Sequence, residues 1–146
     1  MTALRLTDAI IDAVNGALLN RTPVMVAYVD EGGRPHLSLR GSVQVFGPEQ
    51  LAIWVRNPGG GLLSAIPSNP HLSLLYWDPA KRTMYQFHGR ARVDGSAAVR
   101  DHVYANTAEP ERNLDPERGG VAVVVDLDRV EGRDATGPVL MERVPQ

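Results

Sequence analysis

The chain has 146 residues and no cysteine, which predicts a single domain with a hydrophobic core and excludes disulfides, thiolate zinc sites and cysteine nucleophiles. Its formal net charge of −2 argues against general nucleic-acid binding. No signal-peptide pattern and no apolar run near the ~20 residues of a membrane helix is present, so we expect a cytoplasmic protein with no membrane or nucleic-acid partner.

The first part of the chain predicts one helix and three strands. An amphipathic helix is expected over residues 7–19, with Thr7 as its N-cap and apolar residues at helical spacing. Strands are expected at 22–30, 35–46 and 51–55, joined by the turns "EGGRP" and "GPEQ". In 35–46 the apolar set Leu37, Leu39, Val43 and Val45 alternates with the polar set His36, Ser38, Arg40, Ser42 and Gln44. We expect the apolar set in the core and the polar set on the outer face.

The stretch "WVRNPGGGLLSAIPSNP", residues 54–70, follows the third strand. Its three glycines permit positive φ angles and a close approach of the backbone to a ligand. The run either forms a turn alone or holds a phosphate at the start of one or two helical turns.

The second part continues the strand pattern. Strands are expected at 71–77, 82–93 and 121–134, and a helix of about ten residues is expected within 94–107. Residues 108–120 are predicted to be a surface loop, and the tail 136–146 carries no clear pattern. The sum is about six strands, mostly in antiparallel hairpins, with short helices beside them, which is typical of a small barrel in one domain over residues 1–146.

The order of these motifs resembles one known family. The hairpin "TPVMVAYVDEGGRPHLSLRGSVQVF", the segment "LAIWVRNPGGGLLSAIPSNPHLSLLYWDP" and the strand "TMYQFHGRARVDG" follow an N-terminal helix. This order is similar to that of the pyridoxamine 5′-phosphate oxidase-like flavoproteins, whose superfamily includes the flavin/deazaflavin-dependent oxidoreductases, over residues 5–130. The resemblance implies a mainly β fold with minor α, a six-stranded antiparallel split β-barrel of the FMN-binding type. It also implies a homodimer with the cofactor at the dimer interface.

The resemblance also implies where a cofactor would lie. The flavin ring would lie near residues 40–43 and the end of the third strand, and its phosphate near residues 59–62. The strand 82–93 would approach the site, from the same or the second subunit. The candidate cofactor-binding residues are Arg40, Ser42, Trp54, Arg56, Asn57, Gly60, Gly61, Gln86 and His88. Many relatives carry a basic residue about where this chain has Leu62, so backbone N–H groups and Arg56 are the expected phosphate ligands.

Several alternatives stay open. The first hypothesis is an oxidoreductase that uses FMN or coenzyme F-420 on a small-molecule redox substrate. The second is a non-catalytic protein, or a haem-binding or haem-degrading one, on the same scaffold, with His88 as a candidate iron ligand. A dimer without ligand is the third. The four histidines show no metal-site spacing, no residue stands out as catalytic, and Trp54 and Trp77 can equally be core or interface residues.

Overall fold

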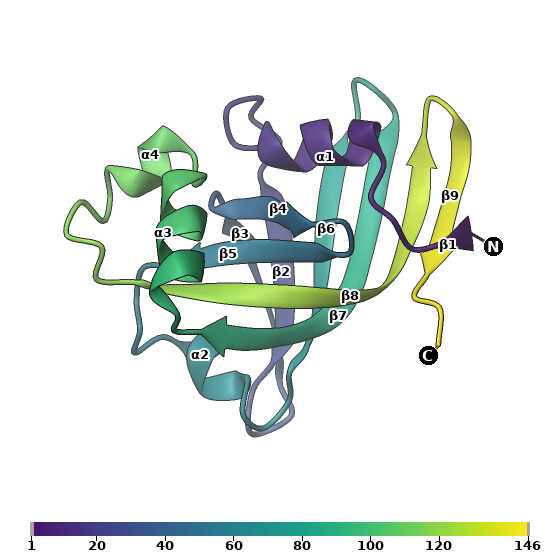
Figure 1. The fold of residues 1–146 in the computed structure, drawn as a ribbon. Coiled ribbons are helices and arrows are strands. Elements are labelled where there is room, and N and C mark those ends of the chain that lie inside the picture. The colour runs from purple at the N-terminus through teal and green to yellow at the C-terminus, as the bar shows by residue number, and fades with distance from the viewer. Residues whose placement is uncertain (1, 146) are drawn as a thin grey trace.

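The computed structural model describes residues 2–145 and is built mainly of strands (Figure 1). The strands are β1 (Thr2–Ala3), β2 (Val24–Val29), β3 (Pro35–Arg40), β4 (Val43–Gly47), β5 (Gln50–Val55), β6 (His71–Asp78), β7 (Thr83–Asp94), β8 (Val121–Asp134) and β9 (Gly137–Glu142). The helices are α1 (Asp8–Asn15), α2 (Gly61–Ala65), α3 (Ala97–Ala105) and α4 (Glu109–Arg112).

All the strands belong to one sheet that branches at β8. The path runs β3–β2–β6–β7–β8, and every pair in it is antiparallel. The first half of β8 then pairs with β5, which pairs with β4, while its second half pairs with β9. The prediction of a mainly β chain with minor α is confirmed. The strand count of six was wrong, because 35–46 forms two strands, the tail adds β9 and the N-terminal residues add β1. The sheet is open where β3 and β4 form its edges.

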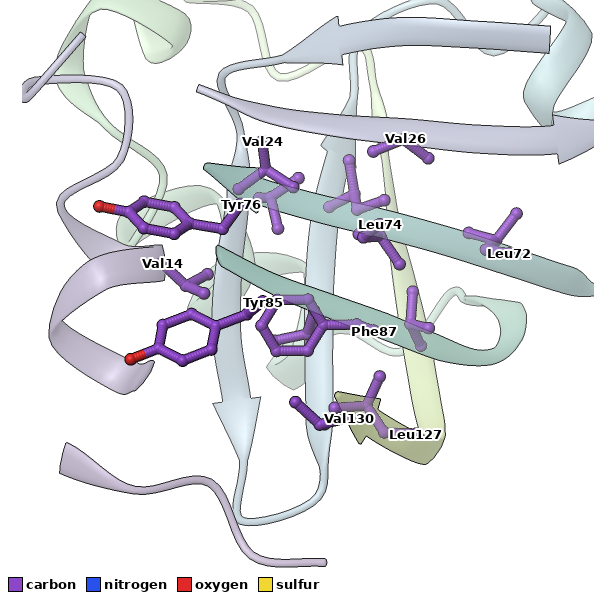
Figure 2. Close-up of a cluster of buried hydrophobic side chains, with 14 of the residues drawn as sticks. Val14, Val24, Val26, Leu72, Leu74, Tyr76, Tyr85, Phe87, Leu127 and Val130 are labelled. Carbon is purple, nitrogen blue, oxygen red and sulfur yellow. The ribbon is translucent and has the colours of Figure 1, made fainter. Parts of the chain in front are cut away.

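The core lies between two parts of this bent sheet. In Figure 1, β4, β5 and the start of β8 cross in front of β2 and β6. Buried aliphatic and aromatic side chains from both parts form a single cluster, and Figure 2 shows the portion around Val24, Leu74, Tyr85 and Phe87. Alternate residues of β7 point into it. The alternation in 82–93 predicts Tyr85, Phe87, Ala91 and Val93 on one face; the first three are buried, whereas Val93 is 49% exposed.

Helix α1 packs on this core through Ile10 and Val14. The Thr7 hydroxyl accepts a hydrogen bond from the Ile10 amide at 3.3 Å, so the predicted N-cap is confirmed. The helix ends at Asn15, four residues before the predicted end. Gly16 follows as the C-cap, and a glycine there favours termination over propagation.

The predicted strand 35–46 is interrupted at residues 41–42, and its first half faces the opposite way from the prediction. Leu37 and Leu39 are 69% and 64% exposed. In the second half Val43 is buried as predicted, and Ser42 and Gln44 are buried as well. The reason in the first half is register: Arg40 lies opposite Val24 and therefore shares the inner face of the sheet. The break at residues 41–42 then passes the chain from the edge strand β3 to β4.

Helix α3 covers the outer face of β5 and β8. It is capped by Ser96, whose hydroxyl accepts from the Val99 amide at 3.3 Å, as expected for a helix within 94–107. A second apolar cluster forms beneath it from Ala52, Trp54, Val103, Tyr104 and Ala122. The region 108–120, predicted to be a loop, contains the short helix α4 directly after α3.

A different part of the outer face carries exposed apolar side chains. Directly paired residues share a face, and the registers join Leu39, Met25, Leu75, Gln86, Glu131 and Leu140 in one row across six strands. A neighbouring row contains Trp77 beside Met84. We call this surface the bare sheet face and define it by its exposed apolar residues Leu37, Leu39, Trp77, Met84 and Leu140.

Among residues 2–145, the structure contains no helix with the length and apolar character needed to cross a membrane.

Candidate functional site

A cavity of about 240 Å³ opens where β3 and β5 end and α2 begins. Six of the nine predicted cofactor-binding residues line it, namely Arg40, Ser42, Trp54, Arg56, Asn57 and Gly60. Leu39, Gly41, Val55, Leu62 and Glu111 complete the lining. The structure thus brings together residues from the two segments that the sequence pattern singled out, and adds Glu111 of α4, which the pattern did not.

Arg40 is the least solvated cation of this cavity. Its inward orientation on β3 places the guanidinium Nε in the interior, where that atom has no hydrogen-bond partner among the described residues. Burial lowers the pKa of Arg40, and the positive charge of Arg56 lowers it further. An arginine nevertheless stays charged in a protein, so the cavity holds a buried charged donor that lacks an acceptor, which is costly unless a ligand supplies one.

Arg56 and Glu111 form an ion pair at the mouth of the cavity. Their Nε and Oε2 atoms are 3.6 Å apart, and the side chains are 47% and 19% exposed. The other carboxylate oxygen of Glu111 lies so close to Gly41 that a Cβ at that position would contact it. The cavity therefore contains two guanidinium groups and one carboxylate.

Ser42 and Trp54 are engaged in the protein itself. The Ser42 hydroxyl donates to the Trp54 carbonyl at 2.7 Å and so joins the start of β4 to β5. The Trp54 indole is 2% exposed, lies edge-on to Tyr104 beneath α3, and donates from Nε1 to Asp115 at 2.9 Å. The Trp54 ring is therefore a core residue, which is one of the alternatives that the sequence left open.

Asp115 is the anchor of the loop that follows α4. Burial raises the pKa of its carboxyl, but hydrogen bonds from the Trp54 indole and the Gly119 and Gly120 amides outweigh this and hold the pKa below its usual value. The carboxylate therefore connects the ring under α3 to the backbone leading into β8.

The glycine run makes a turn built around Asn57. The Gly59 amide donates to the Asn57 side chain at 3.1 Å, and the Gly60 amide donates to the Asn57 carbonyl at 3.0 Å. None of the glycines 59–61 has a positive φ angle, so the turn does not use the conformation that glycine permits there. At Gly61 the backbone lies close to the protein's own Tyr28, because a Cβ there would collide with the Tyr28 hydroxyl, and Gly61 is not among the residues that line the cavity.

Gln86 and His88 lie away from this cavity, on the bare sheet face. Gln86 is opposite Leu75, and His88 is opposite Ser73. The His88 Nδ1 is 3.2 Å from the Ser73 hydroxyl, and its Nε2 is 3.8 Å from a Glu131 oxygen. His88 also lines a second, mainly apolar cavity of about 260 Å³ together with His71. Within one chain these two residues therefore do not meet Arg40 and Arg56.

No group of three or more His, Asp or Glu side chains suited to a metal ion occurs in the described part of the chain. The residue that the sequence analysis missed at the cavity is Glu111. It lies in a proline-bearing polar stretch, and its only local signal is Pro110 at a position that can begin a helix.

Solved structures share this architecture over nearly the whole chain. An FMN-binding protein related to pyridoxamine 5′-phosphate oxidase from Nostoc punctiforme is 15% identical, with a TM-score of 0.68 over 92% of this chain and 88% of its own. A Clostridium acetobutylicum protein related to general stress protein 26, of the pyridoxinephosphate oxidase family, is 12% identical, with a TM-score of 0.65 over 94% and 96%. This chain has the pyridoxamine 5′-phosphate oxidase-like fold. The resemblance drawn from the sequence motifs is confirmed at this level.

The chain is also similar in structure to HupZ of Group A Streptococcus. That structure is 18% identical, with a TM-score of 0.68, and covers 92% of this chain and 98% of its own. No family model matches the sequence, and a search of curated proteins finds no match. The identities are low, so these comparisons establish architecture, while any ligand has to be argued from the residues of this chain.

Proposed function

We propose that this protein is an oxidoreductase dependent on FMN or coenzyme F-420, with the phosphate of the cofactor in the cavity between Arg40 and Arg56. The observation that carries the proposal is the buried Nε of Arg40, a charged donor without an acceptor, beside a second guanidinium. Guanidinium groups bind phosphate oxygens through charge-assisted hydrogen bonds. The fold shared with an FMN-binding protein supports the same interpretation.

The side chains would divide the work of binding. Arg40 and Arg56 would hold the anionic end, and the turn formed by Asn57 would fix the backbone beside it. The Gly59 and Gly60 amides already have acceptors in that turn. The guanidinium groups would therefore make most of the hydrogen bonds to the phosphate. The bound cofactor would supply hydride chemistry, and the protein would supply position and electrostatics.

The proposal includes a homodimer in the cytoplasm, assembled through the bare sheet face. A cavity of about 240 Å³ is smaller than the roughly 300–1,000 Å³ of typical small-molecule pockets, so the rest of the cofactor needs further walls. The bare sheet face supplies exposed apolar area for a two-fold contact. Gln86 and His88 lie on it, and a dimer would offer them to a cofactor held at the interface.

The test is titration of the purified protein with FMN and with coenzyme F-420, followed by absorbance and fluorescence. We expect one of them to bind saturably, and Arg56→Ala to weaken its binding about tenfold or more through loss of a charged ligand. Arg34→Ala is the matched control, because Arg34 is an exposed arginine in the turn before β3. Binding of neither cofactor, or equal affinity of Arg56→Ala and the control, would contradict the proposal.

A second candidate, a haem-binding protein, is favoured by one observation. His88 lies in a mainly apolar cavity with its Nδ1 near the Ser73 hydroxyl, and an imidazole oriented by its other nitrogen is typical of metal ligands. Titration with haemin tests it. A sharp Soret band that disappears in His88→Ala and persists in His102→Ala, which changes an exposed histidine on α3, would favour haem over flavin. A cofactor that binds without turnover would indicate a non-catalytic carrier.

A further inference from the structure

The cavity between Arg40 and Arg56 contains an acidic side chain of the protein itself. Glu111 belongs to α4, which follows α3 closely in the chain, and its carboxylate lies within 3.6 Å of the Arg56 guanidinium. It also acts on Arg40, whose pKa it raises against the stronger effect of burial. A carboxylate in this place has the charge and the acceptor atoms of the anion that the cavity would bind.

The backbone that carries Glu111 is held firmly. The Arg112 guanidinium donates to the Thr107 and Ala105 carbonyls, and the Tyr104 hydroxyl lies within hydrogen-bond distance of the Arg112 carbonyl. These contacts attach α4 to the end of α3, and they do not involve the Glu111 side chain. The carboxylate can therefore change its rotamer while the helix that bears it stays in place.

The charges in the cavity indicate how Glu111 would affect a bound phosphate. Arg40 and Arg56 contribute two positive charges and Glu111 one negative charge, whereas a phosphate monoester carries about −1.5 to −2 at neutral pH. Two guanidinium groups alone would balance such a ligand. With Glu111 in place the sum is negative, and like charges at short range in a partly buried site repel strongly.

We infer that Glu111 is a specificity-determining residue that competes with a ligand phosphate for Arg56 and lowers the preference of the cavity for phosphorylated over unphosphorylated ligands. The inference rests on the proposed function, because it takes the cavity as the phosphate site. It assigns to α4 a role that the positions of Arg40 and Arg56 alone do not give.

The experiment compares FMN with riboflavin, which lacks the phosphate, in the wild-type protein and in Glu111→Gln. Glutamine keeps the shape and removes the charge. We expect Glu111→Gln to bind FMN about tenfold or more tightly and riboflavin with unchanged affinity. Glu109→Gln is the matched control, since it alters an exposed glutamate on the same helix. The gain should disappear when Arg56→Ala is added to Glu111→Gln.

The outcomes separate this inference from the proposed function. If the wild-type protein binds FMN and Glu111→Gln binds it equally or more weakly, Glu111 is a structural residue or a ligand to the ribityl hydroxyls, and the inference alone is overturned. An equal gain for riboflavin would also overturn it, because the effect would not depend on the phosphate. If neither protein binds FMN or inorganic phosphate, the inference is overturned, and if coenzyme F-420 does not bind either, the proposed function falls with it.

Discussion

The outer surface of the sheet has two regions, one covered by a helix and one exposed. Over β5 and the first half of β8, α3 covers the strands and buries Trp54. Over β3, β2, β6 and β7, comparable apolar side chains are exposed, and Trp77 has 54% of its surface accessible. The two tryptophans show that the chain supplies its own cover for one region only. Exposed apolar patches of this kind often mark interaction surfaces, and this region is the one that the proposed dimer would use.

The largest expected loss of stability comes from a substitution in the region that α3 covers. Trp54→Ala should lower the free energy of unfolding by about 3–5 kcal/mol, the usual cost of removing a buried tryptophan, and it also leaves Asp115 without its indole donor. Chemical denaturation at several protein concentrations measures this. Trp77→Ala is the control: its effect should grow with protein concentration, because stability gained through assembly follows mass action. Equal and concentration-independent losses in both variants would contradict the distinction between the two regions.

The next effect concerns the bare sheet face. Leu39→Asp places a charge within the proposed interface, on the edge strand β3 opposite Met25, and should weaken dimerisation about hundredfold, or ~2.8 kcal/mol. Sedimentation measures the change, and circular dichroism should show the same strand content. Leu114→Asp alters another exposed leucine outside this face and should leave the dimer intact. A wild-type protein that stays monomeric at high concentration would refute the proposed use of this surface.

The smallest expected effect is on how the free energy of unfolding depends on acidic pH, through Asp115. The folded-state pKa of Asp115 lies below its usual value, so its stabilisation is present above ~3.9, the unfolded value, and is lost as the pH falls through the folded pKa. Asp115→Asn should cost at most about 1 kcal/mol near neutral pH, because the carboxylate is partly solvated. The difference from wild type should shrink at about pH 3.

Urea unfolding at the two pH values gives the comparison for Asp115. Asp101→Asn, on the exposed side of α3, serves as the control and should leave the pH profile as it is in the wild type. A loss for Asp115→Asn that is the same at both pH values would show that the carboxylate charge is not what stabilises the covered region.

Local pattern was sufficient for much of the fold. Thr7 and Ser96 cap their helices because a hydroxyl before an apolar-periodic segment can accept from the first turn. The alternation in β7 placed Tyr85 and Phe87 in the core, since a strand with one strongly apolar face buries it. The motif order from the first hairpin to β7 was enough to indicate the pyridoxamine 5′-phosphate oxidase-like fold.

The sequence predicted only part of the candidate site. The family resemblance implied Arg40, Arg56 and Asn57 as site residues, and the structure places them at one cavity. Glu111 was missed, because its position depends on how α3 and α4 return over the end of the sheet. Gln86 and His88 were assigned to the site with the others, but in one chain they lie on the bare sheet face.

The sequence by itself determined most of the helices and strands, the hairpin order and the turn at Asn57, because caps, alternation and turn residues act over a few positions. It missed α4, β9 and the division of 35–46 into β3 and β4. Only the tertiary structure decided that Leu37 and Leu39 face outward while Arg40 turns inward. A period of two shows that a strand has two faces and does not say which face meets the core. In β3 the pairing with β2 makes that choice, and it leaves the Arg40 guanidinium in the cavity where an anion would bind.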